Sequence, residues 1–482
     1  MSQRRQPMNY SQLLDQYPVF QRIRAVVDQT QLETYVVGGF VRDLMLTRPS
    51  KDIDIVCVGS GIGLAKAVAE ALGKADSLVV FKNFGTAKVR WEGWELEFVG
   101  ARKESYRRDS RNPAVEDGTL QDDQCRRDFT INALAICLNN NLWGELVDPF
   151  EGVKDLKRRI IRTPLTPAKT FSDDPLRMLR AVRFAAQLAM DIAPDTLSAI
   201  QQHADRINIV SQERVIAELN KIIATPTPSR GFYLLDQLGL LRIVFPELMA
   251  LKGVETIQGY SHKDNFHHTL QVLDNVAKTS DKLWLRWAAL LHDIAKPLTK
   301  RFDPAIGFTF HSHEEQGARM VPHIFKKMKL PMRENMAYVQ KIVRLHLRPI
   351  ALVQEEVTDT AIRRLVYEAG NDLEDLMLLC RADITSKNDA KVKRYLQNFD
   401  QVEDKIQWVE AKDALRNFRS VITGDTIMQT FGLKPSSLVG ELKEAVKEAV
   451  LQGELKNEHE AAYHYLLALG KTRGLQAVAT TQ

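Results

Sequence analysis

Two aspartates, two residues apart in an otherwise apolar strand pattern, constrain this chain more than any other feature. Asp52 and Asp54 stand in the run KDIDIV, and side chains two apart on a strand point to the same face. Neighbouring carboxylates in an apolar strand repel one another and are poorly solvated, so we expect a divalent cation at the strand end. Oxygen ligands of this kind suit Mg²⁺. Taken alone, Asp-x-Asp is a weak motif that also fits a strand end with exposed acids.

A glycine pair lies upstream of the aspartates. Gly38 and Gly39 follow the strand-like run ETYVV and precede a short helical run that holds Arg42. Glycine permits a tight turn in which backbone amides approach a triphosphate closely. The order strand, glycine pair, helix and strand with paired aspartates is specific, and it indicates a nucleotide-binding site.

The pattern of the chain predicts an α+β fold with an N-terminal mixed sheet and helical units behind it. Residues 33–100 alternate short β-rich runs with two helical runs. Residues 101–126 are charged and turn-rich, and we expect a mobile loop there. After about residue 165 almost every segment has helical periodicity, with a break at GLKPSSLVG.

Composition limits the class of protein. The chain has 482 residues, 44% hydrophobic and 26% charged, and a mild net charge of +5. It contains no apolar run of about eighteen residues, and basic residues near its start precede no apolar core, so we expect no membrane span and no secretory signal. Its four cysteines show no paired spacing, as is usual for reduced thiols, which predicts a cytoplasmic protein.

The strand, glycine and aspartate order resembles the polymerase beta-like nucleotidyltransferase superfamily. Within it, almost the whole chain resembles the bacterial class II CCA tRNA nucleotidyltransferases and the related bacterial poly(A) polymerases. The resemblance implies that Asp52 and Asp54 hold two Mg²⁺ ions. One ion activates the RNA 3′-hydroxyl and the other carries the triphosphate. A third carboxylate often lies on a neighbouring strand, and Glu97, which shares a face with Glu95, is the candidate.

A second resemblance covers the run RRDFTIN. It is similar to the family's R-R-D motif, which implies that Arg127 binds phosphate and that Asp128 or Asn132 selects the ribose. A guanidinium fork suits phosphate oxygens, and a carboxylate or amide oxygen can accept from a 2′-hydroxyl. The alternative is a surface ion pair. The run from Asp148 to Arg162, with Gly152 in a turn, is similar to the family's hinge element.

A third resemblance covers the run SDDPLRMLR. Its serine and acids are typical of a helix start with Pro175 in the first turn and an Asp174–Arg177 ion pair. It also resembles the family's E-D-x-x-R motif, which implies that Asp174 and Arg177 read the edge of the incoming base. Asp173 stands where the family usually has Glu, and Arg180 either contacts phosphate or braces the helix. Downstream, Ser211 predicts a capped helix that braces the base-reading one.

A separate set of histidines and aspartates lies further along. Histidine is the commonest metal ligand, and several with a fixed order argue against packing alone. The order resembles the HD phosphohydrolases, with two further histidines that match their two-metal versions. The set implies a divalent transition metal such as Mn, Ni or Co, and its members are His268, His292, Asp293, Asp383, His313 and His346.

These observations predict four regions: a catalytic head at 1–165, a nucleotide-selecting, RNA-binding neck at 166–255, an HD domain at 256–400 and a tRNA-contacting tail at 401–482. The predicted reaction is template-independent addition of C, C and A to tRNA from CTP and ATP. The alternatives are a poly(A) polymerase, a partial CC- or A-adding enzyme, an HD phosphohydrolase with an RNA-binding head, and a non-enzymatic RNA-binding protein. The sequence leaves the oligomeric state and the HD substrate open.

Overall fold

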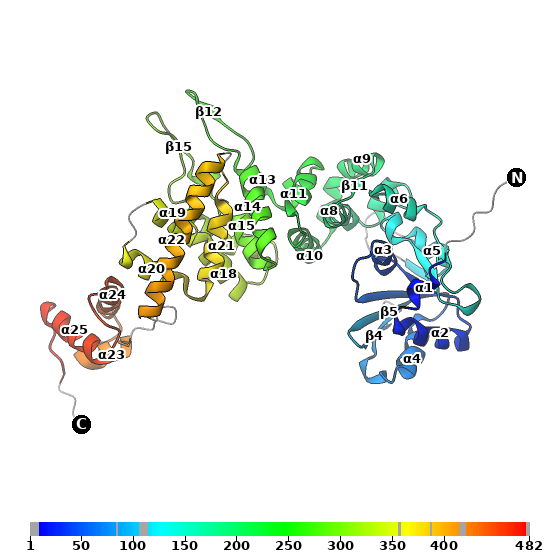
Figure 1. The fold of residues 1–482 in the computed structure, drawn as a ribbon, viewed down its shortest axis with the longest axis horizontal. Coiled ribbons are helices and arrows are strands. Elements are labelled where there is room, and N and C mark those ends of the chain that lie inside the picture. The colour runs from blue at the N-terminus through cyan, green and yellow to red at the C-terminus, as the bar shows by residue number, and fades with distance from the viewer. Residues whose placement is uncertain are drawn as a thin grey trace. The chain divides into compact units, whose positions relative to one another are not determined.

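The computed structural model describes residues 9–82, 85–105, 114–354, 358–385, 388–413 and 421–478. The chain forms two compact units, Met1–Met249 and Ala250–Gln482, which are coloured from blue to green and from green to red in Figure 1. No helix in the described part of the chain has the length and apolar character needed to cross a membrane.

A seven-stranded mixed sheet forms the start of the first unit. Its strand order is β3-β4-β5-β2-β1-β8-β9, and β2 lies between antiparallel β1 and parallel β5. The five strand runs expected between residues 33 and 100 are present. The strands are β1 (Thr34–Val37), β2 (Asp52–Cys57), β3 (Val79–Phe81), β4 (Thr86–Trp91), β5 (Trp94–Gly100), β8 (Ala135–Cys137) and β9 (Leu146–Val147).

Short helices accompany this sheet. Helix α4 makes the crossover between parallel β2 and β5, and it packs so tightly that a Cβ at Gly61 would lie 2.5 Å from the Gly100 nitrogen. A glycine at the first turn of α4 is therefore required by close approach. The helices are α1 (Ser11–Leu14), α2 (Pro18–Thr30), α3 (Gly39–Met45), α4 (Gly61–Ala71), α5 (Leu120–Cys125) and α6 (Gly152–Arg158).

The expectation of a loop across residues 101–126 is wrong for the described part of that segment. Strands β6 (Arg102–Ser105) and β7 (Ala114–Asp117) pair as an antiparallel ribbon, and α5 follows. The side chain of Thr119 accepts from the Asp122 amide while Asp122 accepts from the Thr119 amide, a capping box that explains the helix start. Residues 106–113 lie outside the described residues.

Helices make up the rest of the first unit. They are α7 (Pro167–Asp173), α8 (Leu176–Leu188), α9 (Pro194–His203), α10 (Gln212–Ile223), α11 (Pro228–Gln237), α12 (Leu241–Val244) and α13 (Pro246–Met249), with the parallel pair β10 (Ile160–Ile161) and β11 (Asp191–Ile192) between them. Two expected helix starts need correction. Ser172 does not cap α8, because it lies inside α7, which begins with Pro167. Ser211 precedes α10 without a capping hydrogen bond, since Arg214 stands where a capping box needs Glu or Gln.

Within its described residues, the second unit is helical except for two short hairpins, which helical periodicity does not predict. The hairpins pair β12 (Thr256–Ile257) with β13 (Tyr260–Ser261) and β14 (Arg301–Asp303) with β15 (Gly307–Thr309). The helices are α14 (Asn265–Thr279), α15 (Leu283–Leu291), α16 (Lys296–Thr299), α17 (His313–Lys327), α18 (Glu334–Leu345), α19 (Leu347–Gln354), α20 (Asp359–Ala369), α21 (Leu373–Asp383), α22 (Asp389–Asp413), α23 (Gly424–Phe431), α24 (Ser437–Gln452) and α25 (His459–Thr472).

The last three helices have a core of their own. Ile427 and Phe431 of α23 pack with Leu442 of α24 and Leu466 of α25. Helix α23 ends at Phe431 and α24 begins at Ser437, so the helix break expected in GLKPSSLVG is confirmed.

Candidate active sites

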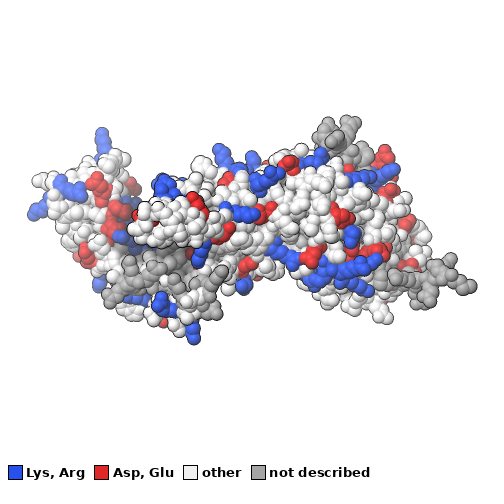
Figure 2. All heavy atoms as spheres, turned by 90° about the horizontal axis from the view of Figure 1, so that it is seen from above, with Lys and Arg blue, Asp and Glu red and all other residues white. Residues whose placement is uncertain are grey.

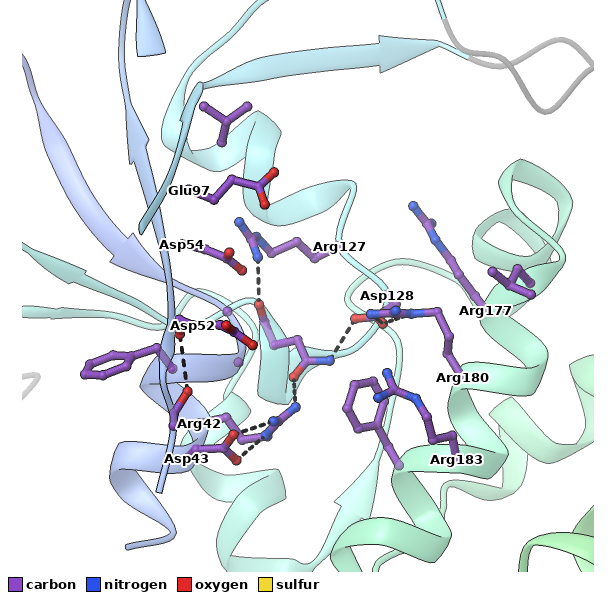
Figure 3. A pocket seen from close by; sticks show the side chains of 18 of the residues that line it. Arg42, Asp43, Asp52, Asp54, Glu97, Arg127, Asp128, Arg177, Arg180 and Arg183 are labelled. Atoms are coloured by element: carbon purple, nitrogen blue, oxygen red, sulfur yellow. Dashed lines mark hydrogen bonds and ion pairs between the residues drawn. The ribbon is translucent and has the colours of Figure 1, made fainter. Parts of the chain in front are cut away.

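Strand β2 presents the two aspartates of the paired-carboxylate motif on one face. Ile53 and Ile55 are fully buried on the other face of the sheet, as the two-residue period of a strand requires. In the parallel pairing with β5, Asp54 lies opposite Glu97 and Asp52 lies opposite Glu95. Figure 3 shows Asp52, Asp54 and Glu97 following one another along the wall of a cavity.

The charges on this wall are only partly balanced. Burial raises the pKa of Asp54. The nearby charges of Glu97 and Asp52 raise it further, and the positive charge of Arg127 lowers it. Lys88 of β4 contacts Glu97, with 3.1 Å between Nζ and Oε2. Sequence reasoning missed this lysine, although its place between buried Ala87 and Val89 assigns it to the same face as the carboxylates.

These oxygen donors fit a hard divalent cation. The cation would relieve the burial of Asp54 and the repulsion between the neighbouring carboxylates. Within the described residues, however, the side-chain oxygens of Asp52, Asp54 and Glu97 do not form a group whose members all lie within 4.8 Å of one another. The three carboxylates therefore lie in a row along the cavity wall rather than around a single metal position.

The glycine turn brings backbone next to Arg127. Gly38 has φ +75°, which disfavours any side chain, and a Cβ there would lie 2.8 Å from Arg127 Nη1 and 3.3 Å from Asp54 Oδ2. Arg127 is held in place by Asp123, at 2.9 Å from Nη2 to Oδ2. Asp123 is fully buried. Its spacing of three and four residues before Arg126 and Arg127 is a helical ion-pair signal that the sequence analysis overlooked.

A continuous network of polar side chains connects the seven-stranded sheet with α8. Arg42 Nη1 donates to Asn132 Oδ1 at 2.8 Å, and Asn132 Nδ2 donates to Asp128 Oδ1 at 3.0 Å. Asp128 Oδ2 lies 2.6 Å from Arg180 Nη2. Burial alone would raise the pKa of Asp128, but Arg180 and the bond from Asn132 lower it to about 2. These four candidates line the cavity, and their mutual bonds hold the cavity wall rigid.

The network continues into α10 through Glu218. This carboxylate is buried and lies 2.7 Å from Arg183 Nε and 3.0 Å from Lys221 Nζ. The guanidinium of Arg183 also stacks on Phe184, with 4.0 Å between its carbon and the ring centroid. Burial lowers the pKa of Arg183 to about 10, and the carboxylate of Glu218 opposes this fall.

The two expected base readers have separate partners. Asp174 Oδ2 accepts from Arg214 Nη2 at 3.0 Å, and Asp174 Oδ1 accepts from the Leu176 amide at 3.1 Å. Arg177 Nη2 donates to the carbonyl of Arg126 at 2.5 Å. The expected ion pair between Asp174 and Arg177 is therefore wrong, because each side chain already has another partner.

The cavity has a volume of about 810 Å³. Figure 3 shows the carboxylates of β2 and β5 on one side and the arginines of α8 on the other. Of the candidates in this unit, Asp173 at the end of α7 does not line it. The candidates that do line it are Gly38, Gly39, Arg42, Asp52, Asp54, Glu97, Arg127, Asp128, Asn132, Asp174, Arg177 and Arg180.

The expected hinge element includes the start of α6. Asp148 accepts from the amides of Gly152 and Val153 at the start of α6, at 2.7 and 3.0 Å. A Cβ at Gly152 would lie 2.4 Å from the Thr130 carbonyl oxygen. Gly152 is therefore required by close packing rather than by a turn.

The second unit contains a separate cluster of histidines and aspartates. His268, His292 and Asp383 form one group whose ligand atoms all lie within 4.8 Å, and Asp293, His313 and His346 form another. Asp293 joins the two groups, since its Oδ2 lies 3.3 Å from His292 Nε2 and its Oδ1 lies 3.2 Å from His313 Nε2. His267, the residue before His268, is exposed on α14.

Hydrogen bonds to the backbone orient the imidazole rings of this cluster so that Nε2 can bind a metal ion. The Nδ1 atoms of His292, His313 and His346 face backbone carbonyls at 2.7, 2.8 and 2.7 Å. A carbonyl only accepts, so Nδ1 carries the proton and Nε2 carries the lone pair. These three buried Nε2 atoms make no hydrogen bond among the described residues. Orphaned imidazole nitrogens beside two carboxylates fit a divalent transition metal.

Three protein families match successive parts of the chain. The poly A polymerase head domain matches residues 34–162, which contain the carboxylate wall. The family described as "Probable RNA and SrmB- binding site of polymerase A" matches residues 189–252, and the HD domain matches residues 265–388.

Whole proteins of known activity extend the match. An A-adding tRNA nucleotidyltransferase of Deinococcus radiodurans is 33% identical over 71% of this chain and 78% of its own length. A multifunctional CCA protein of Nitrosococcus oceani is 33% identical over 76% of this chain and 88% of its own length. The chain belongs to the tRNA nucleotidyltransferase family. It is therefore an enzyme, and nucleotidyltransferases of this family use divalent metal ions.

Solved structures share the fold of this tRNA nucleotidyltransferase. The Bacillus stearothermophilus CCA-adding enzyme, in complex with CTP, superposes with a TM-score of 0.69 over 95% of this chain and 99% of its own, at 24% identity. The expected α+β architecture, with a nucleotidyltransferase head followed by helical units and an HD domain, is confirmed.

Proposed function

We propose that this enzyme adds C, C and A to the 3′ end of tRNA from CTP and ATP without a nucleic acid template. One observation carries the proposal: a single cavity has paired carboxylates on β2 along one wall and the Asp174–Arg177 pair at the start of α8 along the other. The first wall suits the transfer chemistry, and the second suits the choice of base.

The carboxylate wall would bind two Mg²⁺ ions through Asp52 and Asp54, with Glu97 as a third ligand. Mg²⁺ bound there would supply activation of the RNA 3′-hydroxyl and neutralisation of the triphosphate. Arg127, close above Gly38, would contact the phosphates, and the backbone of the glycine turn would approach them. The 3′-oxygen then bonds to the α-phosphorus, the bond to the β-phosphate oxygen breaks, and pyrophosphate leaves.

Base choice would rest on Asp174 and Arg177. Cytosine and adenine both carry an exocyclic amine on the pairing edge, whereas uracil and guanine carry a carbonyl there. A carboxylate accepts from the amine, and a guanidinium donates to a ring acceptor. For this contact, Arg177 must exchange its bond to the Arg126 carbonyl for one to the base. Arg214, bonded to Asp174, would orient the carboxylate during this step.

The tRNA would be held mainly through its backbone and shape by residues 166–255 and 401–482. Lys and Arg side chains are spread over the whole face seen in Figure 2, with Asp and Glu among them. Basic side chains on this face offer contacts to phosphate groups.

The test is extension of tRNA that lacks its CCA end, with each nucleoside triphosphate alone and with CTP and ATP together. The proposal predicts a product that ends in CCA and stops. A single A on tRNA that already ends in CC would favour A addition alone, and a long A tail would favour a poly(A) polymerase.

The histidine cluster supports a second activity, hydrolysis of phosphoesters at RNA ends. Four histidines and two aspartates form two adjoining groups, and the Nε2 atoms of His292, His313 and His346 make no hydrogen bond among the described residues. Such a site prefers Mn²⁺, Ni²⁺ or Co²⁺ over Mg²⁺. A metal held there would make bound water nucleophilic near neutral pH. With a 2′,3′-cyclic phosphate, the water oxygen bonds to phosphorus, one ring ester bond breaks and the departing ribose oxygen takes a proton. The product is a phosphomonoester and a free hydroxyl.

The test of this second activity is metal analysis together with a phosphodiesterase assay. Protein incubated with Mn²⁺, Ni²⁺ or Co²⁺ is expected to retain metal and to open cyclic phosphates. Protein that binds no metal and opens no cyclic phosphate would show that the HD domain is a scaffold.

A further inference from the structure

Two hairpins lie next to the histidine cluster and contact one another. Figure 1 shows β12 and β15 projecting from the same side of the second unit. Tyr260 of the first hairpin packs on Gly307 of the second, where a Cβ would lie 2.9 Å from Tyr260 Cδ1. Gly307 also has φ +86°, so both the backbone and the contact require glycine there. The hairpins therefore form one rigid edge.

This edge forms an aromatic recess that ends at the metal-type ligands. His262 stands edge-on to Phe308 and to Phe310, with ring centroids 5.0 and 5.9 Å apart. All three rings are half-buried. Together with His268 and Asp383 they line a recess of about 420 Å³, within the range of about 300–1,000 Å³ usual for small-molecule sites.

Positive charge lies at the same rings. Lys296 Nζ is 5.6 Å from the Phe310 centroid and 2.6 Å from Asp293 Oδ2, so it borders both the recess and the cluster. Lys300 Nζ is 5.9 Å from the Phe308 centroid. Ammonium groups beside half-buried rings suit a ligand that has both an anionic group and a flat ring.

A buried amide adds hydrogen-bonding capacity. Asn265 is only 7% exposed. It lines this recess and also an adjoining recess of about 210 Å³. No hydrogen bond of its carboxamide is found within the described ranges. An amide offers both donor and acceptor to a ring edge.

We propose that this recess binds the terminal ribonucleotide of a phosphorylated RNA end, with its base against Phe308 and Phe310 and its phosphate directed to His268 and Asp383. The proposal rests on the phosphohydrolase activity proposed above and names the residues that choose its substrate. Asn265 contacts the base edge, and Lys296 contacts the phosphate. A free nucleotide presents the same chemistry, so both forms belong in the test.

The first experiment locates the base without relying on turnover. Full-length protein is irradiated with 8-azidoadenosine 2′,3′-cyclic phosphate, free or as the last residue of an RNA, and the labelled peptides are mapped. Label in residues 301–313 is expected from both probes, with stronger labelling by the RNA if its upstream nucleotides also bind. Label that appears only in the first unit, or in the second unit away from both hairpins, overturns the proposal.

The second experiment separates base binding from hydrolysis. Adenosine 2′,3′-cyclic phosphate is compared with the base-free methyl riboside 2′,3′-cyclic phosphate, in wild type and in Phe308→Ala, Phe310→Ala and Asn265→Ala. Stacking on one ring is worth about a 5- to 150-fold change in affinity. In the alanine variants of the two rings, KM for the nucleotide should rise by that factor while kcat stays unchanged. KM for the base-free substrate should stay at its wild-type value. Phe310→Tyr, which keeps an aromatic ring, should bind the nucleotide as wild type does. Ile306→Ala, at the exposed tip of the same hairpin, is the matched control.

The two proposals fail differently. If wild type opens both substrates equally well and the aromatic variants match it, the recess proposal is wrong and the hydrolase stands. If neither substrate is opened but the hairpin is still labelled, the recess binds nucleotides and the hydrolase is wrong.

Discussion

Asp54 on β2 lies directly opposite Glu97 on β5 in the parallel pairing of the two strands. This relationship places a carboxylate from each strand on the cavity wall, and Lys88 on β4 contacts the second of them. The wall is thus built from three adjacent strands, so its geometry depends on strand register rather than on a loop.

Replacing either aspartate tests this wall. Asp52→Asn or Asp54→Asn should abolish nucleotide addition, because each removes the charge of a proposed metal ligand while keeping the shape of the side chain. Circular dichroism and tRNA binding should stay near wild type. Glu92→Gln, in the exposed turn before β5, is the control. Near-normal extension by either asparagine variant at saturating Mg²⁺ would refute the assignment.

Replacing the base readers should relax selectivity before it stops catalysis. Each lost base-edge contact in Asp174→Ala or Arg177→Ala should cost about 1–3 kcal/mol, by analogy with other base-edge contacts. Single-turnover incorporation of each of the four nucleoside triphosphates measures the effect. Arg214→Ala should act in the same direction but more weakly, since Arg214 only orients Asp174. If the variants slow all four substrates equally, these residues do not select the base.

The segment outside the described residues gives a third prediction. The family resemblance implies that enzymes adding only CC lack a flexible loop between the carboxylates and the base-reading helix, and this chain has the charged residues 106–113 in that interval. Deletion of residues 107–113 should therefore impair A addition more than C addition. The rates of the three successive additions, measured on one tRNA, check this expectation, and an equal loss at all three steps would argue against it.

Glu218 provides a prediction about stability. Glu218→Gln leaves Arg183, whose side chain is 11% exposed, without its counter-charge. Breaking one side of a buried ion pair typically costs about 3–5 kcal/mol, so the free energy of unfolding of the first unit should fall by that order in urea. Glu213→Gln, exposed on the same helix, should change it little. Equal unfolding curves for the two variants would show that the network contributes nothing to stability.

The histidine cluster is tested by its metal content. His292→Ala and Asp293→Ala should each lose bound Mn²⁺, Ni²⁺ or Co²⁺ because each removes a ligand from a different group of the cluster. Addition of C and A should persist, since the head has carboxylates of its own. His267→Ala, on the exposed side of α14, should keep the metal. Wild-type metal content in both cluster variants would contradict the assignment.

Strand periodicity was sufficient to predict the carboxylate wall, because Asp52 and Asp54 alternate with isoleucines that must be buried. It did not predict Lys88 or Asp123, whose roles depend on which strand or helix lies next to them. The run SDDPLR has every local sign of a helix start. Ser172 nevertheless belongs to the preceding helix, since Pro167 starts α7 earlier, and tertiary contacts decide between two such starts.

The hairpins of the second unit were missed for a different reason. Strands of two or three residues, such as β12 and β15, are too short to show any period. What fixes them is the contact of Tyr260 with Gly307, which joins residues far apart in the sequence. The recess they form is therefore visible only in the structure.

The most direct test of the account is extension of one tRNA that ends before its CCA sequence. We expect two additions with CTP alone, no long tail with ATP alone, and one A after CC when both are present, with no further growth. No extension under any of these conditions, or a long tail from ATP alone, would contradict it.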